Sequence, residues 1–263
     1  MRDPVKQLAT RWVGRPTHVH ESVDSTNDLL AALAASGAPA GTTVVATHQT
    51  AGRGRRNRRW LAPPATALLF SVLFRPHWPA LQAHWLTMLA GLAMIRAVET
   101  HSPLQLGLKW PNDLMLYDAK GPTPQWCKTG GILLETTLSA DHLQQAILGI
   151  GLNVNIPRQH LPSGPTPATS LLAAGGKALD RPSLLAQLLL ELETLYERAD
   201  AGQSPQPAWD SRLITRNHPV RVSDDNHVLE GIALGSDKWG RLLVRDAQGA
   251  VHHIAAGDVT LRS

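Results

Sequence analysis

The chain has 263 residues, of which 43% are hydrophobic, with a formal net charge of +4 and a single cysteine, Cys127. This length suits one main domain with a small appendage, and the composition excludes the disordered and fibrous classes of protein. One cysteine excludes an intramolecular disulfide framework and a cysteine-based zinc site. We find neither a signal peptide nor an apolar run long enough to cross a bilayer. We therefore expect a cytoplasmic protein whose mild positive charge suits acidic ligands or partners.

In the first half of the chain the pattern predicts strands with two helices between them. Ser25 and Asp28 have the spacing of a helix capping box, which predicts a helix that stops at Gly37. Pro79 opens a second, mostly buried helix that reaches about residue 100, with Leu81 facing inward. The predicted strands are 17–22, 42–48, 66–74, 106–110, 129–137 and 145–153. So many strands with few helices favour an α+β fold, a mixed and largely antiparallel sheet backed by helices.

The second half predicts a connection, two helices and a separate all-β unit. Residues 156–183 are rich in proline and glycine and predict a surface connection with one helical turn near Leu171. Helices are predicted at 184–198 and 207–215, followed by short strands at 220–222, 227–234, 241–245, 251–254 and 259–261. Regular short strands separated by glycines predict a small β-barrel. We therefore expect a main domain over residues 1–216 and a β-barrel domain over residues 217–263.

Residues 52–60 (GRGRRNRRW) hold five arginines between two predicted half-buried strands. Glycine lets a backbone approach a ligand, and guanidinium groups match the oxygens of carboxylates and phosphates. A run this basic is by itself most often a solvated face or a nucleic-acid footprint. Its place between two strands favours instead an anion-binding loop that is presented by a rigid scaffold.

Three further strings each allow a structural and a functional interpretation. In 109–113 (KWPND) the Pro-Asn-Asp triplet is good turn chemistry, but a lysine and an aspartate bracket it. Gly130-Gly131 fits either a β-bulge or the close approach of a ligand. Residues 149–155 (GIGLNVN) can be a strand whose small residues lie under a neighbouring ring.

Cysteine and histidine offer little evidence of catalysis or metal binding. Cys127 lies beside Lys128, but no His/Asn pattern supports a reactive thiol, so we expect it to pack in the interior. Twelve histidines include two close pairs, His18/His20 and His252/His253. Neither pair has a carboxylate or cysteine partner at ligand spacing, so we expect no protein metal site.

Taken in order, these strings closely resemble the biotin protein ligases over nearly the whole length of the chain. The matching segments are 24–27 (DSTN), 49–56 (QTAGRGRR), Trp60, 109–113, 128–133 (KTGGIL), 149–153, 235–237 (GSD) and 257–258 (GD). Asn57 stands where the family usually has glycine. Because asparagine tolerates left-handed backbone geometry, we expect the loop to form.

The resemblance implies a fold, a two-step reaction and a set of site residues. The main domain would be a class II aminoacyl-tRNA synthetase/biotin synthetase-like catalytic domain. Biotin and ATP would give biotinyl-5′-AMP, with Mg²⁺ on the phosphates, and the biotinyl group would pass to one lysine of a carboxylase carrier domain. The implied biotin contacts are Ser25, Thr26, Asn27, Gln49, Gly52, Arg53, Gly54, Arg55, Lys128 and Gly131. The implied ATP contacts are Arg55, Arg58, Trp60, Lys109, Asn112 and Asn153, and the implied catalytic residues are Arg53, Lys109, Asp113 and Lys128.

Some members of this family carry an N-terminal helix-turn-helix domain. About 24 residues precede Ser25, too few for such a domain, so we expect no sequence-specific DNA binding. The sequence leaves homodimer formation open. Two other functions stay open as well: a lipoate or octanoate ligase or transferase of related fold, and a nucleic-acid-binding module that uses the arginine-rich loop.

Overall fold

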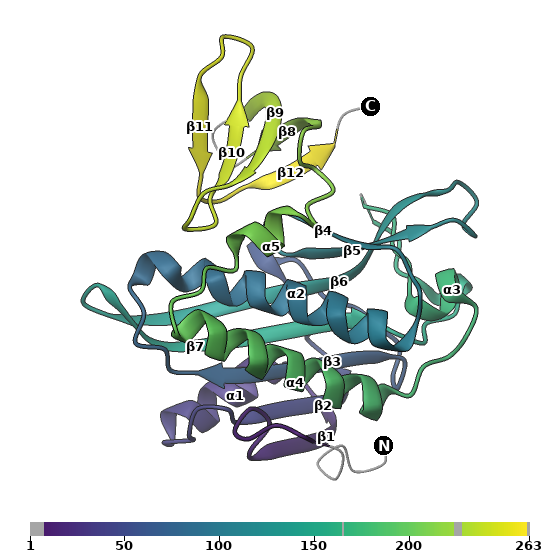
Figure 1. Cartoon of the computed structure of the whole chain (residues 1–263). Coiled ribbons are helices and arrows are strands. Elements are labelled where there is room, and N and C mark those ends of the chain that lie inside the picture. The colour runs from purple at the N-terminus through teal and green to yellow at the C-terminus, as the bar shows by residue number, and fades with distance from the viewer. Residues whose placement is uncertain (1–7, 165, 224–227, 262–263) are drawn as a thin grey trace.

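The computed structural model describes residues 8–164, 166–223 and 228–261. A seven-stranded sheet in the order β1-β2-β3-β7-β6-β5-β4 runs through the main body (Figure 1). The pair β1–β2 is parallel and every other neighbouring pair in this sheet is antiparallel. The predicted α+β class, with a mixed and largely antiparallel sheet, is confirmed.

The strands of this sheet are β1 (Thr17–Val23), β2 (Thr43–Gln49), β3 (Ala67–Phe74), β4 (Leu106–Lys109), β5 (Asp113–Asp118), β6 (Gln125–Ser139) and β7 (His142–Asn153). The sequence prediction omitted β5, a short apolar run between two aspartates that contains no β-branched residue. It was also wrong to expect β3 to be half-buried, because every residue of β3 is buried. Helix α1 (Thr26–Ala35) covers the second face of β3, and its Leu30 packs with Leu73.

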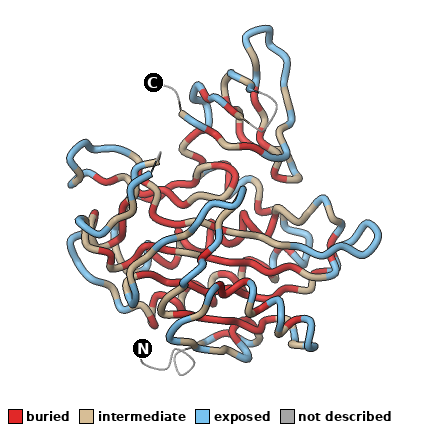
Figure 2. Tube along the Cα trace, turned by 180° about the vertical axis from the view of Figure 1, so that it is seen from behind, coloured by how far each residue is buried: buried red, intermediate tan, exposed pale blue. Residues whose placement is uncertain are grey.

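The remaining helices are α2 (Ala83–His101), α3 (Leu171–Gly175), α4 (Arg181–Asp200) and α5 (Gln206–Asp210). Helices α2 and α4 pack together along one face of the sheet, opposite α1 (Figure 1). Buried residues follow the sheet and the helices beneath it, whereas the loop tips are exposed (Figure 2). The helix expected to open at Pro79 begins only at Ala83, after a 3₁₀ turn, so Leu81 is 64% exposed rather than inward. The helix predicted at 207–215 is shorter than expected, because α5 ends at Asp210.

The apolar character of α2 corrects one expectation from the sequence. The helical stretch Ala80–His101, 22 residues long, is long and apolar enough to cross a membrane by length and composition alone. However, 72% of its apolar window is buried inside the protein, between the sheet and α4. We therefore assign α2 as the core helix of the main body.

A second, five-stranded antiparallel sheet has the order β11-β10-β9-β8-β12. Its strands are β8 (Pro219–Ser223), β9 (Val228–Ser236), β10 (Leu242–Arg245), β11 (Val251–Ile254) and β12 (Asp258–Leu261), which confirms the predicted all-β unit. The start of the predicted strand 227–234, His227, lies outside the described residues.

Two tryptophans and a histidine attach this second sheet to the main body. The indole N–H of Trp85 donates to Lys238 O at 2.8 Å, and that of Trp110 donates to Gly240 O at 3.0 Å. A Cβ at Gly240 would lie 2.5 Å from the His84 ring, so only glycine fits against it. Burial, with the charge of Arg55 second, lowers the pKa of His84 to about 4, so this contact holds a neutral imidazole at pH 7.

The second sheet also gives both histidines of its pair a carboxylate partner. His252 Nε2 lies 2.6 Å from Asp246 Oδ2, and His253 Nδ1 lies 3.1 Å from Asp237 Oδ2. These are single His–Asp pairs, to carboxylates 6 and 16 residues away, which the sequence pattern did not predict. Within the described ranges, no three His, Cys, Asp or Glu residues gather as metal ligands do. Cys127 is buried, and burial raises the pKa of its thiol, which confirms a packing role.

Asp118, at the end of β5, anchors the connection that follows β7. Its buried carboxylate accepts hydrogen bonds from Arg158 at 2.8 and 3.1 Å and from Thr169 Oγ1 at 2.7 Å. Burial opposes ionisation, but the hydrogen bonds from Arg158 and Thr169 outweigh it and hold the pKa of Asp118 below its usual 3.8. Because Thr169 N donates to Lys128 O, this anchor also positions residues beside β6.

We expect Asp118→Asn to destabilise the chain at pH 7 by about 2 kcal/mol, the usual worth of hydrogen bonds to a charged group. The Asp118 pKa is lower in the folded chain than in the unfolded chain. Its stabilisation is therefore complete above the usual pKa and is lost as the pH falls through the folded value. Urea denaturation across a pH series measures both effects. A variant as stable as the wild-type chain at pH 7 would contradict the anchoring role.

Candidate active site

A cavity of about 660 Å³ lies between the N-terminus of α1, the arginine-rich loop (residues 52–60), the β4–β5 turn, strands β6 and β7, and β12. Most of the residues predicted for the site line it: Ser25, Thr26, Asn27, Gln49, Arg53, Gly54, Arg55, Arg58, Trp60, Lys109, Asn112, Asp113, Lys128 and Gly131. Gly52 and Asn153 are not among the lining residues. The fold thus gathers segments more than 200 residues apart around one cavity.

Glycines of β6 and β7 form the floor of the cavity. An added Cβ would lie 2.5 Å from the Trp60 indole at Gly151 and 3.0 Å from it at Gly131. At Gly149 it would lie 2.2 Å from Asn27 Oδ1. The structural interpretation of the GIG string, small residues under a neighbouring ring, is therefore correct. The places of the missing side chains are thus filled by Trp60 and Asn27.

Gly130-Gly131 coincides with an irregularity in the pairing of β5 with β6. The register shifts between Leu114 and Met115, which oppose Gly130 and Lys128. Thr129 is therefore the extra residue of a β-bulge. The bulge interpretation is therefore correct, and Gly131 also lines the floor of the cavity.

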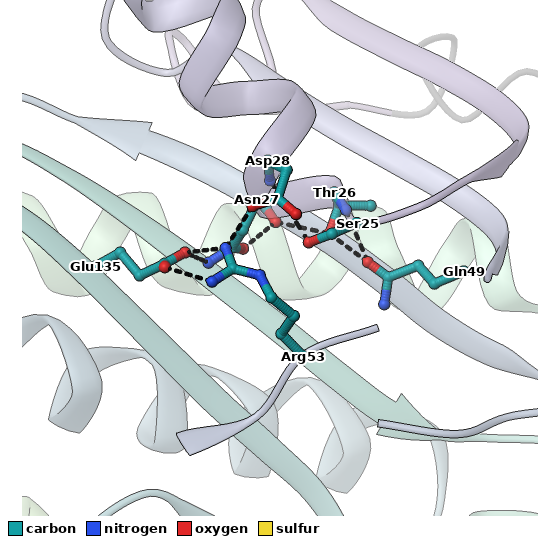
Figure 3. A network of polar contacts seen from close by, with 8 residues as sticks. Ser25, Thr26, Asn27, Asp28, Gln49, Arg53 and Glu135 are labelled. Atoms are coloured by element: carbon teal, nitrogen blue, oxygen red, sulfur yellow. Dashed lines mark hydrogen bonds and ion pairs between the residues drawn. The ribbon is translucent and has the colours of Figure 1, made fainter. Parts of the chain in front are cut away.

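Hydroxyl and amide groups crowd one end of the cavity, at the start of α1 (Figure 3). Ser25 caps the helix by accepting from Asp28 N at 3.4 Å, as the capping box predicted. Gln49 Oε1 accepts from Thr26 N at 2.7 Å and lies 3.0 Å from Thr26 Oγ1. Ser71, on β3, donates to Asn27 Oδ1 at 2.5 Å and was missed in the sequence, because one serine in an apolar strand carries no signal. This polar end offers both donors and acceptors.

The arginine-rich loop folds back on itself as a small hairpin. Gly54 N donates to Arg58 O at 2.7 Å, and Trp60 N donates to Gly52 O at 2.9 Å. At the tip Asn57 has φ 56°, which confirms the expected left-handed geometry at this position. Gly52 begins the loop opposite Trp60, where a Cβ would be 2.6 Å from Trp60 O. Its absence from the cavity lining thus reflects a role in folding the loop.

Carboxylates on three elements tie down the loop arginines. Arg53 binds Glu135 on β6 at 2.8 Å through both nitrogens, and Asp28 at 2.5 Å (Figure 3). Arg58 and Arg56 form ion pairs with Asp258 on β12. The sequence predicted neither Glu135 nor Asp258 as a partner, since both lie far along the chain from the loop. The loop is thereby attached at its base to the main body and at its tip to the second sheet.

Three cations from different elements meet in the middle of the cavity. Lys128 Nζ lies 2.6 Å from Asp113 Oδ1, and Lys109 is the register partner of Asp113. Burial lowers the pKa of Lys109, with Asp113 acting in the opposite direction. Burial likewise lowers the pKa of Arg55, which lies 3.4 Å from Asn112 Oδ1. These pKa shifts record the cost of keeping positive charge in a desolvated place, and an anion there would relieve it.

The opposite end of the cavity is lined by apolar side chains that the sequence interpretation missed. Trp126, Met115 and Ile214 lie there, beside the backbone of Gly107. A Cβ at Gly107 would be 2.3 Å from Ile214 and 3.3 Å from Trp126, so the wall is closely packed. Ile214 comes from the irregular segment after α5, inside the range 207–215 that the sequence pattern predicted to be helical. This end suits a flat, apolar group.

Asn153 lies at the end of β7, outside the cavity lining. Its side chain is buried, and Nδ2 donates to Thr169 O at 3.1 Å. It therefore holds the part of the long connection that lies next to Lys128. The structure places it behind the wall of the cavity.

Comparisons with known proteins agree with this architecture. The model of the biotin/lipoate A/B protein ligase family matches residues 19–153, and that of the biotin protein ligase C-terminal domain matches residues 216–262. The chain is 36% identical over 267 residues to the biotin–[acetyl-CoA-carboxylase] ligase of Mycobacterium tuberculosis, covering 98% of this chain and 93% of that protein. It is 33% identical over 257 residues to the bifunctional ligase/repressor BirA of Bacillus subtilis, covering 97% and 76%.

Among solved structures, the biotin protein ligase of Aquifex aeolicus in complex with biotin and ATP is similar, with a TM-score of 0.75 and 28% identity. That similarity covers 94% of this chain and 98% of the other. The fold is therefore that of the biotin protein ligases. The chain belongs to the biotin/lipoate A/B protein ligase family.

We expect Gly151→Ala to loosen the arginine-rich loop, because the new methyl group would displace the Trp60 indole. Overpacking costs about 1–3 kcal/mol, so amide hydrogen exchange in residues 52–60 should quicken by roughly tenfold. Gly175→Ala is the matched control, since its Cβ would meet Leu104 at an ordinary 3.6 Å. If amide hydrogen exchange in residues 52–60 is unchanged in Gly151→Ala, the position of the Trp60 indole does not depend on this glycine.

Proposed function

We propose that this chain is an ATP-dependent biotin protein ligase that forms biotinyl-5′-AMP and transfers the biotinyl group to a lysine of a biotin carboxyl carrier domain. The observation that carries the proposal is the cavity, in which a polar end, a cationic middle and an apolar end follow one another across the sheet. These three environments match a ureido ring, a carboxylate with a phosphate, and a nucleobase. The similarity to ligases of this name along nearly the whole chain supports the same activity.

The polar end would hold the ureido ring of biotin. This ring has two N–H donors and one strong acceptor, and a buried site must satisfy all three or lose affinity. The hydroxyl and amide groups of Thr26, Gln49 and Asn27 offer both kinds of partner. The valeryl chain would then run alongside the Trp60 indole, which itself covers Gly131 and Gly151, with its carboxylate directed toward Arg55 and Lys128.

In the first step a biotin carboxylate oxygen attacks the α-phosphorus of ATP. A carboxyl O–P bond forms, the bond from the α-phosphorus to the bridging oxygen breaks, and pyrophosphate leaves. The reacting anions repel by roughly 4 kcal/mol per charge pair at 4 Å in an effective dielectric near 20. Lys109, Lys128 and Arg55 would offset this repulsion, with Arg58 nearer the loop tip. Arg53, already bound to two carboxylates, would act by holding the loop.

The donor set fits a Mg²⁺ ion that arrives with the nucleotide rather than a resident ion. The carboxylates that line the cavity are Asp113 and Asp258, and each is paired with a cation. Such a set could lend one carboxylate to an ion bound chiefly by phosphates, which is how proteins commonly hold Mg²⁺. When bound, the ion would neutralise charge on the phosphates.

The nucleobase would occupy the apolar end, against Trp126, Met115 and Ile214. Trp60 and Asn112 line the route to it and are the proposed nucleotide contacts. Asn153 would support this wall from behind, through Thr169. The apolar end thus gives the nucleotide an aromatic surface to stack on.

In the second step the acceptor lysine must lose a proton before its nitrogen attacks the acyl carbon. An amide C–N bond forms, the acyl C–O bond breaks, and AMP leaves. Asp113 is the proposed group that orients the incoming ammonium and accepts its proton. Its present partner, Lys128, would turn to the phosphate once the nucleotide is bound.

We also propose a carboxylase carrier domain as partner, a cytoplasmic location, and no sequence-specific DNA binding. A division into two domains near residue 216 is supported by the second sheet, whose described strands pair only with one another. Homodimer formation stays open. Light scattering and a gel-shift assay with biotin at physiological salt decide the oligomeric state and DNA binding.

Incubation of the purified chain with biotin, ATP, Mg²⁺ and an apo carrier domain should add one biotin-sized mass to a single lysine. Lys128→Met should slow pyrophosphate release by at least ~100-fold, as expected when a preplaced charge is removed. Lys120→Met is the control: it removes the same charge from an exposed lysine that contacts Gly175 O, outside the cavity. An inactive wild-type chain beside an active control ligase would contradict the proposal.

Biotin should raise the melting temperature and lipoate should not. A ligand at a hundred times its Kd stabilises a protein by about 2.7 kcal/mol. The dithiolane ring of lipoate has no N–H or carbonyl, so it could not form the hydrogen bonds that the polar end offers to a ureido ring. Thermal shift assays with each ligand make the measurement. A larger shift with lipoate would favour the lipoate ligase alternative instead.

A further inference from the structure

Glu135, on β6, contacts both the start of α1 at Asn27 and the arginine-rich loop at Arg53. Its carboxylate accepts from both terminal nitrogens of Arg53 at 2.8 Å. Oε2 also accepts from Asn27 Nδ2 at 2.6 Å (Figure 3). Glu135 does not line the cavity, so it would not touch biotin or ATP itself.

The contact with Asn27 decides which way that amide points. An ionised carboxylate only accepts hydrogen bonds, so it selects the NH₂ end of Asn27 and turns Oδ1 toward Ser71. The amide has little space to rotate, because Oδ1 lies where a Cβ on Gly149 would be. Glu135 therefore fixes the donor and acceptor pattern at the polar end.

The contact with Arg53 fixes the base of the loop that covers the same end. An ion pair between half-exposed groups usually stabilises a protein very little. This pair differs in two respects: it is bidentate, and its carboxylate is shared with a buried amide. Displacing the loop would then disturb Asn27 as well.

We propose that Glu135 is a positioning residue that couples closure of the arginine-rich loop to the orientation of Asn27, and so to recognition of the ligand's polar ring. This inference rests on the proposed function. A site that retains an anhydride prone to hydrolysis must exclude water while its ligand is held. The single carboxylate of Glu135 contacts both the loop that would exclude water and the amide that would hold the ligand.

The structure provides matched controls for this role. Glu99 forms an equally exposed pair with Arg212, bidentate at 2.8 and 3.2 Å, with side chains 37% and 39% exposed against 37% and 40% for Glu135 and Arg53. Asp28 holds Arg53 but has no hydrogen bond to the Asn27 side chain among the described contacts. Removing Glu99 measures the general effect of losing an ion pair, and removing Asp28 measures the effect of loosening the loop. Any further effect of removing Glu135 is then due to its contact with Asn27.

The experiment measures biotin Kd by titration calorimetry, ATP KM, and the lifetime of enzyme-held biotinyl-5′-AMP for five chains: wild type, Glu135→Ala, Glu135→Gln, Asp28→Asn and Glu99→Ala. We expect Glu135→Ala to weaken biotin binding and shorten the lifetime at least tenfold each, with ATP KM within twofold. Glu135→Gln should recover much of the affinity, because its carbonyl can still accept from Asn27, but not the lifetime. Asp28→Asn should shorten only the lifetime, and Glu99→Ala should match the wild type.

Three outcomes would overturn the proposal. Glu135→Ala values equal to those of Glu99→Ala would reduce the pair to an ordinary surface contact. If Glu135→Ala does not fold, a Glu135→Gln variant with weakened biotin binding and an unchanged lifetime would contradict the coupling. A wild-type chain that forms no biotinyl-5′-AMP would contradict both this inference and the proposed function, whereas the first two outcomes leave the function intact.

Discussion

The site depends on a sheet surface from which side chains are missing. Gly131 and Gly151 let the Trp60 indole lie directly on β6 and β7, and Gly149 does the same for the Asn27 amide. Alanine at these positions would push the Trp60 ring and the Asn27 amide away from the strands. The loop that carries Trp60 would then lie farther from the sheet. The glycines therefore set how close Trp60 and Asn27 lie to the strands.

Carboxylates hold the loop through Arg53 and Arg58, whereas the middle of the cavity keeps more positive than negative groups. Carboxylates of the main body and of β12 bind Arg53 and Arg58, at the base and near the tip. Lys109 and Arg55 are left in desolvated positions where burial lowers the pKa of each. An incoming carboxylate or phosphate therefore meets partly desolvated cations that are already in place, the arrangement that makes electrostatic stabilisation effective.

Local patterns in the sequence predicted the elements, and long-range contacts account for most of what it missed. The capping box at Ser25, the left-handed Asn57 and the short C-terminal strands are encoded by neighbours in the chain, and all were confirmed. The partners Glu135 and Asp258 lie 82 and 200 residues from the arginines that they bind, so no local spacing could reveal them. The apolar wall at Trp126 and Ile214 was missed for the same reason.

The two ends of the cavity are coupled by the sheet that separates them. β6 carries Glu135 toward the polar end, Lys128 in the cationic middle and Trp126 at the apolar end, on one strand of 15 residues. The bulge at Thr129 interrupts this strand between Lys128 and the glycines, which lets Lys128 reach Asp113 while Gly131 stays beneath Trp60. A single hydrogen-bonded strand thus fixes the spacing between the groups proposed for the ring, the phosphate and the base. Because β6 is paired on both sides, with β5 and β7, its backbone holds this spacing in the chain without a ligand.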